Sequence, residues 1–197
     1  MKLIRKIVRS LNSRGLGGTL LWFIFGYFSI NKFIVFYLNL EKPFEPSQPG
    51  PSVKISKISI DTLNLIRAGA KDLPIEFYCD ETHGFTIPYV AEVDGEIAAI
   101  HWLVKPGEKS RFLELGAGDL EMNFNTVLPK FRDKRLAELL MAKLISSCSG
   151  GDFKRMFGVV HVSNVPQYKQ MIRLGFEPVE VVTHFGMYRP KATLRYV

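Results

Sequence analysis

The sequence predicts an α+β fold with a mixed, mostly antiparallel twisted sheet flanked by helices. Two observations support this prediction. Segments with strand and helix periodicity follow one another in the order strands, helix, strand, helix, strands. The dipeptide Asp94-Gly95 separates two apolar runs in the way that a hairpin turn does. At 197 residues the chain can form one core with an extra element, but not two full domains.

The first 40 residues combine basic and apolar sequence. Residues 2–13 predict an amphipathic helix, and an extra strand is expected elsewhere within residues 1–40. Residues 19–30 are uncharged and mostly apolar, but a bilayer-spanning helix needs about 20 such residues. We expect residues 1–40 to pack on the domain or to contact a membrane surface. A spanning helix or a signal peptide is a further alternative, although no small-residue cleavage site follows.

The net charge of +7 belongs to this segment. Six basic residues and no acidic residue precede Glu41, so 20 of the 26 basic residues remain against 19 acidic ones. A nucleic-acid-binding domain spreads its basic residues over a folded face, so this class is not expected. The charge favours an anionic membrane, contacted peripherally at its inner face, or an acidic partner. Cys79 and Cys148 have no metal or redox spacing, which favours a reducing, cytoplasmic compartment.

Residues 41–52 are rich in proline, serine and glycine and predict a linker. The domain over residues 53–197 then begins with a strand at 53–59 and a helix at 60–70. Strands are predicted at 87–93 and 96–104 as the hairpin, and at 112–115 and 120–127. A helix at 132–147, a strand at 156–162 and a helix at 165–174 ended by Gly175 follow, and strands at 176–182 and 183–189 close the chain.

The segment between residues 121 and 137 carries the chemistry. Its strand leads through a turn into the start of a helix, where free backbone N–H groups and a partial positive charge favour an anion such as a pyrophosphate. Basic side chains in the turn add to this charge: Lys130, Arg132, Lys134 and Arg135.

This segment resembles the cofactor motif of the GNAT (GCN5-related N-acetyltransferase) superfamily. Val127-Leu-Pro129 matches the end of the motif's strand, and Arg132 and Ala137 match the first and last positions of its phosphate loop. The strand Gly158-Val-Val-His-Val162, then Asn164 and a helix ending in Leu174-Gly175-Phe176, resembles the family's second motif. The resemblance covers roughly residues 53–190.

The resemblance implies an acyltransferase that binds acetyl-CoA or another acyl-CoA. The amine acceptor would be a small molecule or a membrane-proximal sugar or amino-acid derivative, and it would attack the thioester directly. The implied cofactor-binding residues are a strand position, the phosphate loop and one residue from the second motif: Val127, Arg132, Asp133, Lys134, Arg135, Leu136, Ala137 and Asn164.

The chain departs from the family pattern at three positions. Arg135 and Asp133 replace glycines of the phosphate loop, and Met171 stands where many members carry a tyrosine that protonates the leaving thiolate. These departures leave open a non-catalytic module of the same fold. The basic turn leaves open an acyl carrier protein as the donor.

The base that removes the proton from the amine has two main candidates. Glu121 occupies the position of the catalytic glutamate in the histone-acetylating members, and a solvated carboxylate at the strand edge is the alternative. His161 lies near the end of the strand expected to diverge from the cofactor strand, and His101 and Tyr168 are lesser candidates. The four histidines show no metal-ligand spacing.

Overall fold

The computed structural model describes residues 17, 30–44, 52–70, 72–132 and 135–185. Its strands are β1 (Ile30–Asn39), β2 (Val53–Lys57), β3 (Ile87–Val93), β4 (Glu96–Val104), β5 (Asp119–Val127), β6 (Arg155–His161) and β7 (Glu177–Phe185). Its helices are α2 (Ile60–Gly69), η1 (Ile75–Tyr78), α3 (Cys79–His83), η2 (Pro129–Phe131), α4 (Leu136–Cys148) and α5 (Val165–Arg173).

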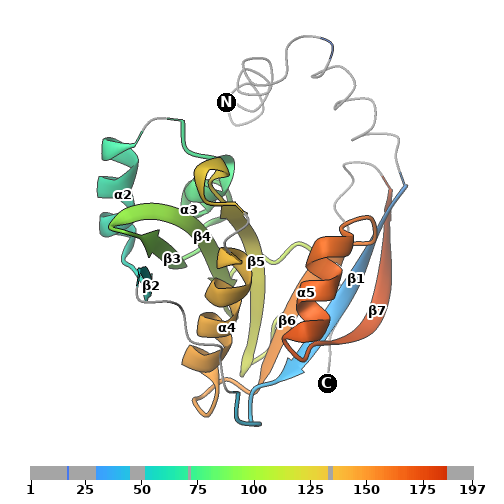
Figure 1. Cartoon of the computed structure of the whole chain (residues 1–197). Coiled ribbons are helices and arrows are strands. Elements are labelled where there is room, and N and C mark those ends of the chain that lie inside the picture. Colours follow the sequence, from blue (N-terminus) through green and yellow to red (C-terminus); the bar gives the residue numbers. More distant parts are fainter. Residues whose placement is uncertain (1–16, 18–29, 45–51, 71, 133–134, 186–197) are drawn as a thin grey trace.

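The described strands form one seven-stranded sheet in the order β2-β3-β4-β5-β6-β1-β7 (Figure 1). β5 and β6 are parallel, and all the other neighbours in the sheet are antiparallel. The α+β class with a mixed, mostly antiparallel sheet is therefore confirmed. The β3–β4 hairpin turns at Asp94-Gly95, where both residues have positive φ, as the sequence predicted.

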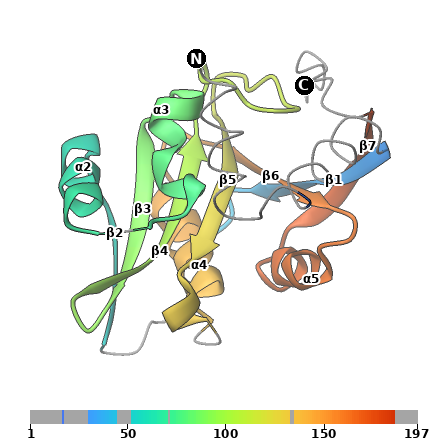
Figure 2. The ribbon, with the colours of Figure 1, turned by 90° about the horizontal axis from the view of Figure 1, so that it is seen from above.

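Helices cover both faces of the sheet (Figure 2). β4 shows the division, because its side chains alternate between two buried clusters. Ala99 and Leu103 pack with residues of α4 and α5, whereas Trp102 packs with residues of α2, η1 and α3. We call these the α4/α5 face and the η1/α3 face. The sheet therefore separates two different layers of helices.

β1 lies inside the sheet, between β6 and β7. Its register pairs Phe36 with Gly158 on β6 and with Pro178 on β7. Val35 and Phe36 have no exposed surface, and they pack into clusters on opposite sides of the sheet. The extra strand predicted within residues 1–40 is thus observed as β1, and it pairs with the last described strand of the chain, β7.

Two predicted helix ends match the structure. Ser59 caps α2, because its side chain accepts a hydrogen bond from the backbone N–H of Thr62. Gly175 ends α5 with φ +83°, the left-handed conformation expected of a residue after a helix. The predicted helix boundaries at residues 60–70 and 165–174 agree with α2 and α5 to within one residue.

The strand predicted at residues 112–115 is not formed. The chain from Lys105 to Gly118 is an irregular loop held by side-chain hydrogen bonds. Glu108 accepts from the backbone N–H of Lys105 at 3.1 Å, and Ser110 accepts from the backbone N–H of Leu113 at 3.1 Å. Phe112 and Leu113 are buried as core residues of this loop, and Leu113 makes one isolated bridge, so their apolar character reflects packing and not a strand.

Two other boundaries were predicted wrongly. The helix expected from residue 132 begins at Leu136, because Pro129 opens a separate turn, η2, and Arg135 has φ +52°, which a helix interior does not accommodate. The two strands expected at 176–182 and 183–189 are one strand, β7, which runs through Val182 and Thr183 without a turn. Residues 186–189 lie outside the described part.

Several predictions concern residues that the structure does not describe. The amphipathic helix at 2–13, the apolar run at 19–29 and most of the linker at 41–52 are among them. Among the described residues, no helix combines the length and the apolar character that crossing a membrane requires.

Candidate active site

The two parallel strands at the centre of the sheet separate after a short paired segment. β5 and β6 pair only over Asp119–Met122 and Arg155–Gly158. Beyond these residues β5 stays paired with β4, and β6 stays paired with β1, so the two strands diverge (Figure 1).

A bulge in β5 lies where this divergence begins. The register with β4 shifts between Ile100 and Trp102, and Phe124 has φ +48°. The side-chain oxygen of Asn123 accepts from the backbone N–H of Phe124 at 2.9 Å and holds this conformation. Bulges bend a strand and change the direction of its side chains, and they are common beside active sites.

A cavity of about 240 Å³ occupies the gap between the separated strands. Its walls come from both faces of the sheet: Glu76 belongs to η1, whereas Met141 belongs to α4 and Met171 to α5. Half of its lining residues are polar: Glu76, His101, Asn123, Asn125, His161, Asn164 and Gln167. The cavity therefore lies between the two helical layers, with walls from both faces of the sheet and polar groups that converge on it.

Asn164 and His161 were predicted as site residues, and both line this cavity. Asn164 caps α5, since its side-chain oxygen accepts from the backbone N–H of Gln167 at 3.3 Å. The Nδ1 atom of His161 accepts from the backbone N–H of Ser163 at 3.2 Å. Because a backbone N–H only donates, the neutral His161 ring carries its hydrogen on Nε2, where it acts as a donor.

Glu121 lies just behind the cavity wall. It has 0% exposed surface, and it is not among the lining residues. Its Oε1 accepts from Nδ2 of Asn123 at 2.8 Å, and its Oε2 has no hydrogen-bond partner. Burial raises the pKa of Glu121 to about 7, against the opposing effect of the Ser110 and Asn123 side chains. The carboxyl group is thus one hydrogen bond away from the cavity.

His101, a lesser candidate in the sequence, also lines the cavity. It comes from β4 and is almost completely buried, with Nδ1 unpaired. Burial lowers the pKa of His101 to about 3, so its imidazole is neutral at physiological pH. A neutral imidazole with this pKa offers a hydrogen bond but is a weak base. Tyr168, the other lesser candidate, packs against Phe36 in the core.

The predicted phosphate-binding residues lie around the start of α4, away from the cavity lining. Arg132 and Arg135 are exposed, while the side chain of Leu136 is buried in the core and that of Ala137 is half-buried. Leu136 and Ala137 can therefore offer an anion their backbone N–H groups and not their side chains. Val127 ends β5 opposite Ala99, and Asp133 and Lys134 lie outside the described residues.

The basic side chains of this region are largely paired within the protein. Lys130 contacts Glu96 at 2.5 Å. Arg135 and Arg173 both bind Glu138, the latter at 2.7 Å. Burial opposes ionisation of Glu138, but the hydrogen bonds from the two arginines prevail and lower its pKa. Arg132 is thus the cation of this group best placed to meet an external phosphate.

The backbone at Arg135, one of the departures from the family pattern, has the conformation of a glycine. The resemblance expects glycine there, and the backbone has the left-handed conformation that glycine adopts without strain. Arg135 adopts this conformation at a cost of roughly 1–2 kcal/mol. Glycine at this position would adopt the same backbone conformation without that cost.

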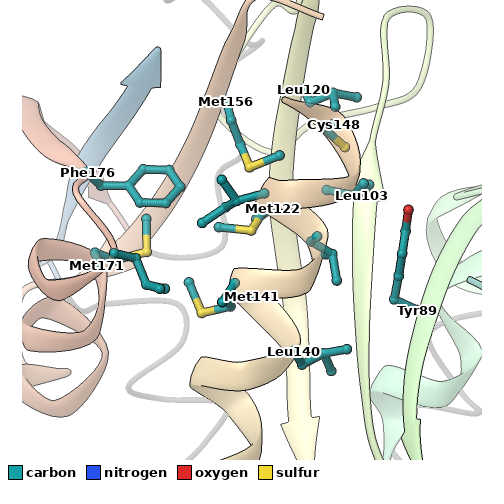
Figure 3. Close-up of a cluster of buried hydrophobic side chains, with 14 of the residues drawn as sticks. Tyr89, Leu103, Leu120, Met122, Leu140, Met141, Cys148, Met156, Met171 and Phe176 are labelled. Atoms are coloured by element: carbon teal, nitrogen blue, oxygen red, sulfur yellow. The ribbon is translucent and has the colours of Figure 1, made fainter. Parts of the chain in front are cut away.

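Met171, which replaces the expected tyrosine, packs where β5 and β6 separate. A Cβ atom added at Gly158 would lie 2.5 Å from the Cε atom of Met171, so glycine leaves the room that this side chain fills. Met171 belongs to a group of buried methionines with Met122, Met141 and Met156 (Figure 3). A thioether donates no proton, so Met171 cannot supply the proton that the tyrosine gives to the leaving thiolate in the family pattern.

Sequence reasoning missed Glu76, Asn123, Asn125 and Gln167 as lining residues. The asparagines carried a signal, because two carboxamides interrupt a strand whose earlier residues are buried. Glu76 showed no signal in the sequence, because η1 is a four-residue turn without periodicity. Glu76 is also far from β5 in the sequence.

Comparisons with known proteins identify the fold. No protein-family model and no curated protein matches the chain. Among solved structures, an acetyltransferase of the GNAT family from Novosphingobium aromaticivorans is similar, with a TM-score of 0.58 and 16% identity over 80% of this chain and 64% of that one. The architecture is that of the GCN5-related N-acetyltransferases, and the predicted resemblance is confirmed for the fold.

Two further structures support this conclusion. A GCN5-related N-acetyltransferase from Sphaerobacter thermophilus has a TM-score of 0.56 and 12% identity over 86% of this chain and 56% of that chain. One from Kribbella flavida has a TM-score of 0.50 and 15% identity over 84% and 60%, respectively. The chain thus spans less than two thirds of the length of each of these structures.

Proposed function

We propose that this protein is an N-acyltransferase that moves an acyl group, most readily acetyl, from CoA to a primary amine. The acceptor is a small molecule or a membrane-proximal sugar or amino-acid derivative. One observation carries the proposal: a polar cavity lined from both faces of the sheet lies where β5 and β6 separate. Two substrates arriving from opposite faces would meet inside it.

The donor fits the residues of the α4/α5 face. Backbone N–H groups at the start of α4 and the side chain of Arg132 suit the pyrophosphate, and Asn164 and the end of β5 at Val127 suit the amide-rich arm. When bound, acyl-CoA supplies the thioester that the amine attacks. The protein contributes orientation, a hydrogen-bond donor at Nε2 of His161, and a site for the released proton.

Glu121 is the base in this proposal. Its pKa of about 7 suits proton removal near neutral pH, where a general base works best. Because Asn123 separates the carboxylate from the cavity, the proposal requires a water molecule to carry the proton from the amine to Glu121. His101 is less suited, since its low pKa makes it a weak base.

Thermal melting with CoA and acetyl-CoA tests the proposal. Ligand at a hundredfold excess over its Kd stabilises a protein by about 2.7 kcal/mol. We expect such a shift for the wild type and a smaller one for Arg132→Glu, with Lys109→Glu, a charge reversal in the loop before β5, as the matched control. If neither ligand shifts the melting temperature, an acyl carrier protein as donor or a non-catalytic role of the fold takes the place of this proposal.

We also propose that the part of residues 1–40 that precedes β1 contacts the inner face of an anionic membrane from the cytoplasm, since β1 itself is held inside the sheet. Five of the basic residues fall between positions 2 and 14, and Ile30 at the start of β1 is 65% exposed. Each basic residue near an anionic surface contributes about 1 kcal/mol. The full chain should co-sediment with vesicles containing phosphatidylserine, and changing Arg5, Lys6 and Arg9 to Gln should release it. Equal binding to neutral vesicles would contradict an electrostatic contact.

A further inference from the structure

On the η1/α3 face, the cavity is lined by Glu76, which belongs to the short turn η1. The backbone oxygen of Glu76 accepts from Nε1 of the buried Trp102 at 2.7 Å. The next carbonyl, that of Phe77, accepts from Nε of Arg67 at 2.8 Å, and the Phe77 side chain has no exposed surface. η1 therefore fixes the position of Glu76 although it is only one turn long.

The carboxylate of Glu76 is left available. Within the described part of the chain, no hydrogen bond or ion pair joins its side-chain oxygens to another residue. Arg67, which donates to the neighbouring Phe77 carbonyl, forms its ion pair with Asp80 and not with Glu76. A carboxylate at a cavity wall without a protein partner suits a cationic ligand.

The remaining lining residues define what else the ligand carries. Of the described residues that line the cavity, Glu76 is the one carboxylate, and none is a lysine or arginine. Four carboxamides and two imidazoles supply both donors and acceptors: Asn123, Asn125, Asn164, Gln167, His101 and His161. This set pairs well with hydroxyl or amide groups, but it offers no full positive charge to a phosphate or carboxylate on the ligand.

We propose that Glu76 binds the ammonium group of the acceptor, and that the acceptor is a small primary amine rich in hydroxyl groups and free of phosphate and carboxylate, such as an unphosphorylated amino sugar. The inference rests on the proposed function, because it assigns the acceptor of the same cavity. The cavity volume of about 240 Å³ lies below the usual range for drug-sized ligands, which favours a small acceptor.

The test measures amine binding without any donor. D-Glucosamine, glucosamine 6-phosphate, N-acetylglucosamine and n-butylamine are titrated into the full chain and followed by ligand-observed NMR. Glucosamine should bind at least tenfold more tightly than each of the other three, which respectively add an anion, remove the cation and remove the hydroxyl groups. Equal binding of glucosamine 6-phosphate or butylamine would overturn the inference, and so would a lack of glucosamine binding.

Glu76→Gln then tests the residue. It should weaken glucosamine binding at least tenfold, and in turnover it should raise KM more than it lowers kcat. Glu81→Gln is the matched control, since Glu81 is exposed on the adjacent α3 and does not line the cavity. The CoA-induced melting shift should be the same in both variants. If the wild type binds glucosamine but shows no melting shift with CoA, the proposed function alone is refuted. If the wild type shows the normal shift and Glu76→Gln binds glucosamine as tightly as the wild type does, this inference alone is refuted.

Discussion

Glu121 combines complete burial with a single hydrogen bond to one of its two carboxyl oxygens. This arrangement favours the neutral form in the folded state, because the ionised form has lost its hydration. The sequence identified the position through the resemblance, but it left a solvated carboxylate as the alternative. The structure shows a buried group. β5 is enclosed between β4 and β6, which lie far from each other in the sequence, so this burial could not be predicted from the residues near Glu121.

Replacing Glu121 by glutamine should change how stability depends on pH. The pKa of Glu121 rises from 4.5 to about 7 on folding, so below about pH 4.5 the carboxyl is protonated in both states. Between pH 4.5 and 7 the unfolded state ionises first, and the wild type loses stability that Glu121→Gln keeps. By pH 8 this difference should reach roughly 3 kcal/mol at most.

Urea denaturation of both proteins at pH 4.5 and at pH 8 measures this effect. The free energy of unfolding of the variant relative to the wild type should increase between the two pH values. A difference that stays constant would show that Glu121 titrates normally in the folded protein, and it would remove the reason for choosing this residue as the base.

At the scale of single elements, local signals in the sequence predicted most of the structure. The Asp94-Gly95 turn and Gly175 after α5 are short-range features, and both appear as expected. The Ser59 cap is also a local feature, but the prediction placed Ser59 at the end of a strand. The failures have non-local causes. η1 and α3 are too short for periodicity, and the loop at residues 105–118 is fixed in part by Thr86, which donates to Glu108 from 22 residues away.

The end of α5 provides a stability test at this scale. Gly175 has φ +83°, so Gly175→Ala should reduce the free energy of unfolding by about 1 kcal/mol or more. Gly69→Ala is the matched control, because Gly69 lies within α2, lacks positive φ and has open space around it. The control should be neutral or stabilising by up to about 1 kcal/mol. Denaturation curves that rank the two variants in the reverse order would contradict the assigned backbone conformation.

At the scale of the whole molecule, the cavity depends on how strands from distant parts of the chain combine. The sequence located β5, β6 and the helix that follows each of them. It did not show that β1 lies between β6 and β7, because strand order arises from pairing between segments more than a hundred residues apart. For the same reason Glu76 could not be assigned to the site, whereas Asn164 and His161, which belong to a local motif, could.

The position of β1 predicts a strong effect of its core residues on stability. Phe36 has no exposed surface and packs on the α4/α5 face, so Phe36→Ala should cost about 3–5 kcal/mol. Ile30→Ala, on the same strand but largely exposed, should change the free energy of unfolding by less than about 0.5 kcal/mol. Both values follow from chemical denaturation. A small effect of Phe36→Ala would indicate that the sheet holds together without β1.

The central place of β1 also affects the order in which the sheet can assemble during synthesis. The ribosome makes β1 before every other described strand, yet both of its neighbours, β6 and β7, emerge more than a hundred residues later. At about 5–20 residues per second, this apolar strand waits for roughly 5 to 25 seconds without its partners. In the folded protein β6 diverges from β5 by pairing with β1, and α5 adds lining residues, so the cavity cannot be complete before β6 and α5 have left the ribosome.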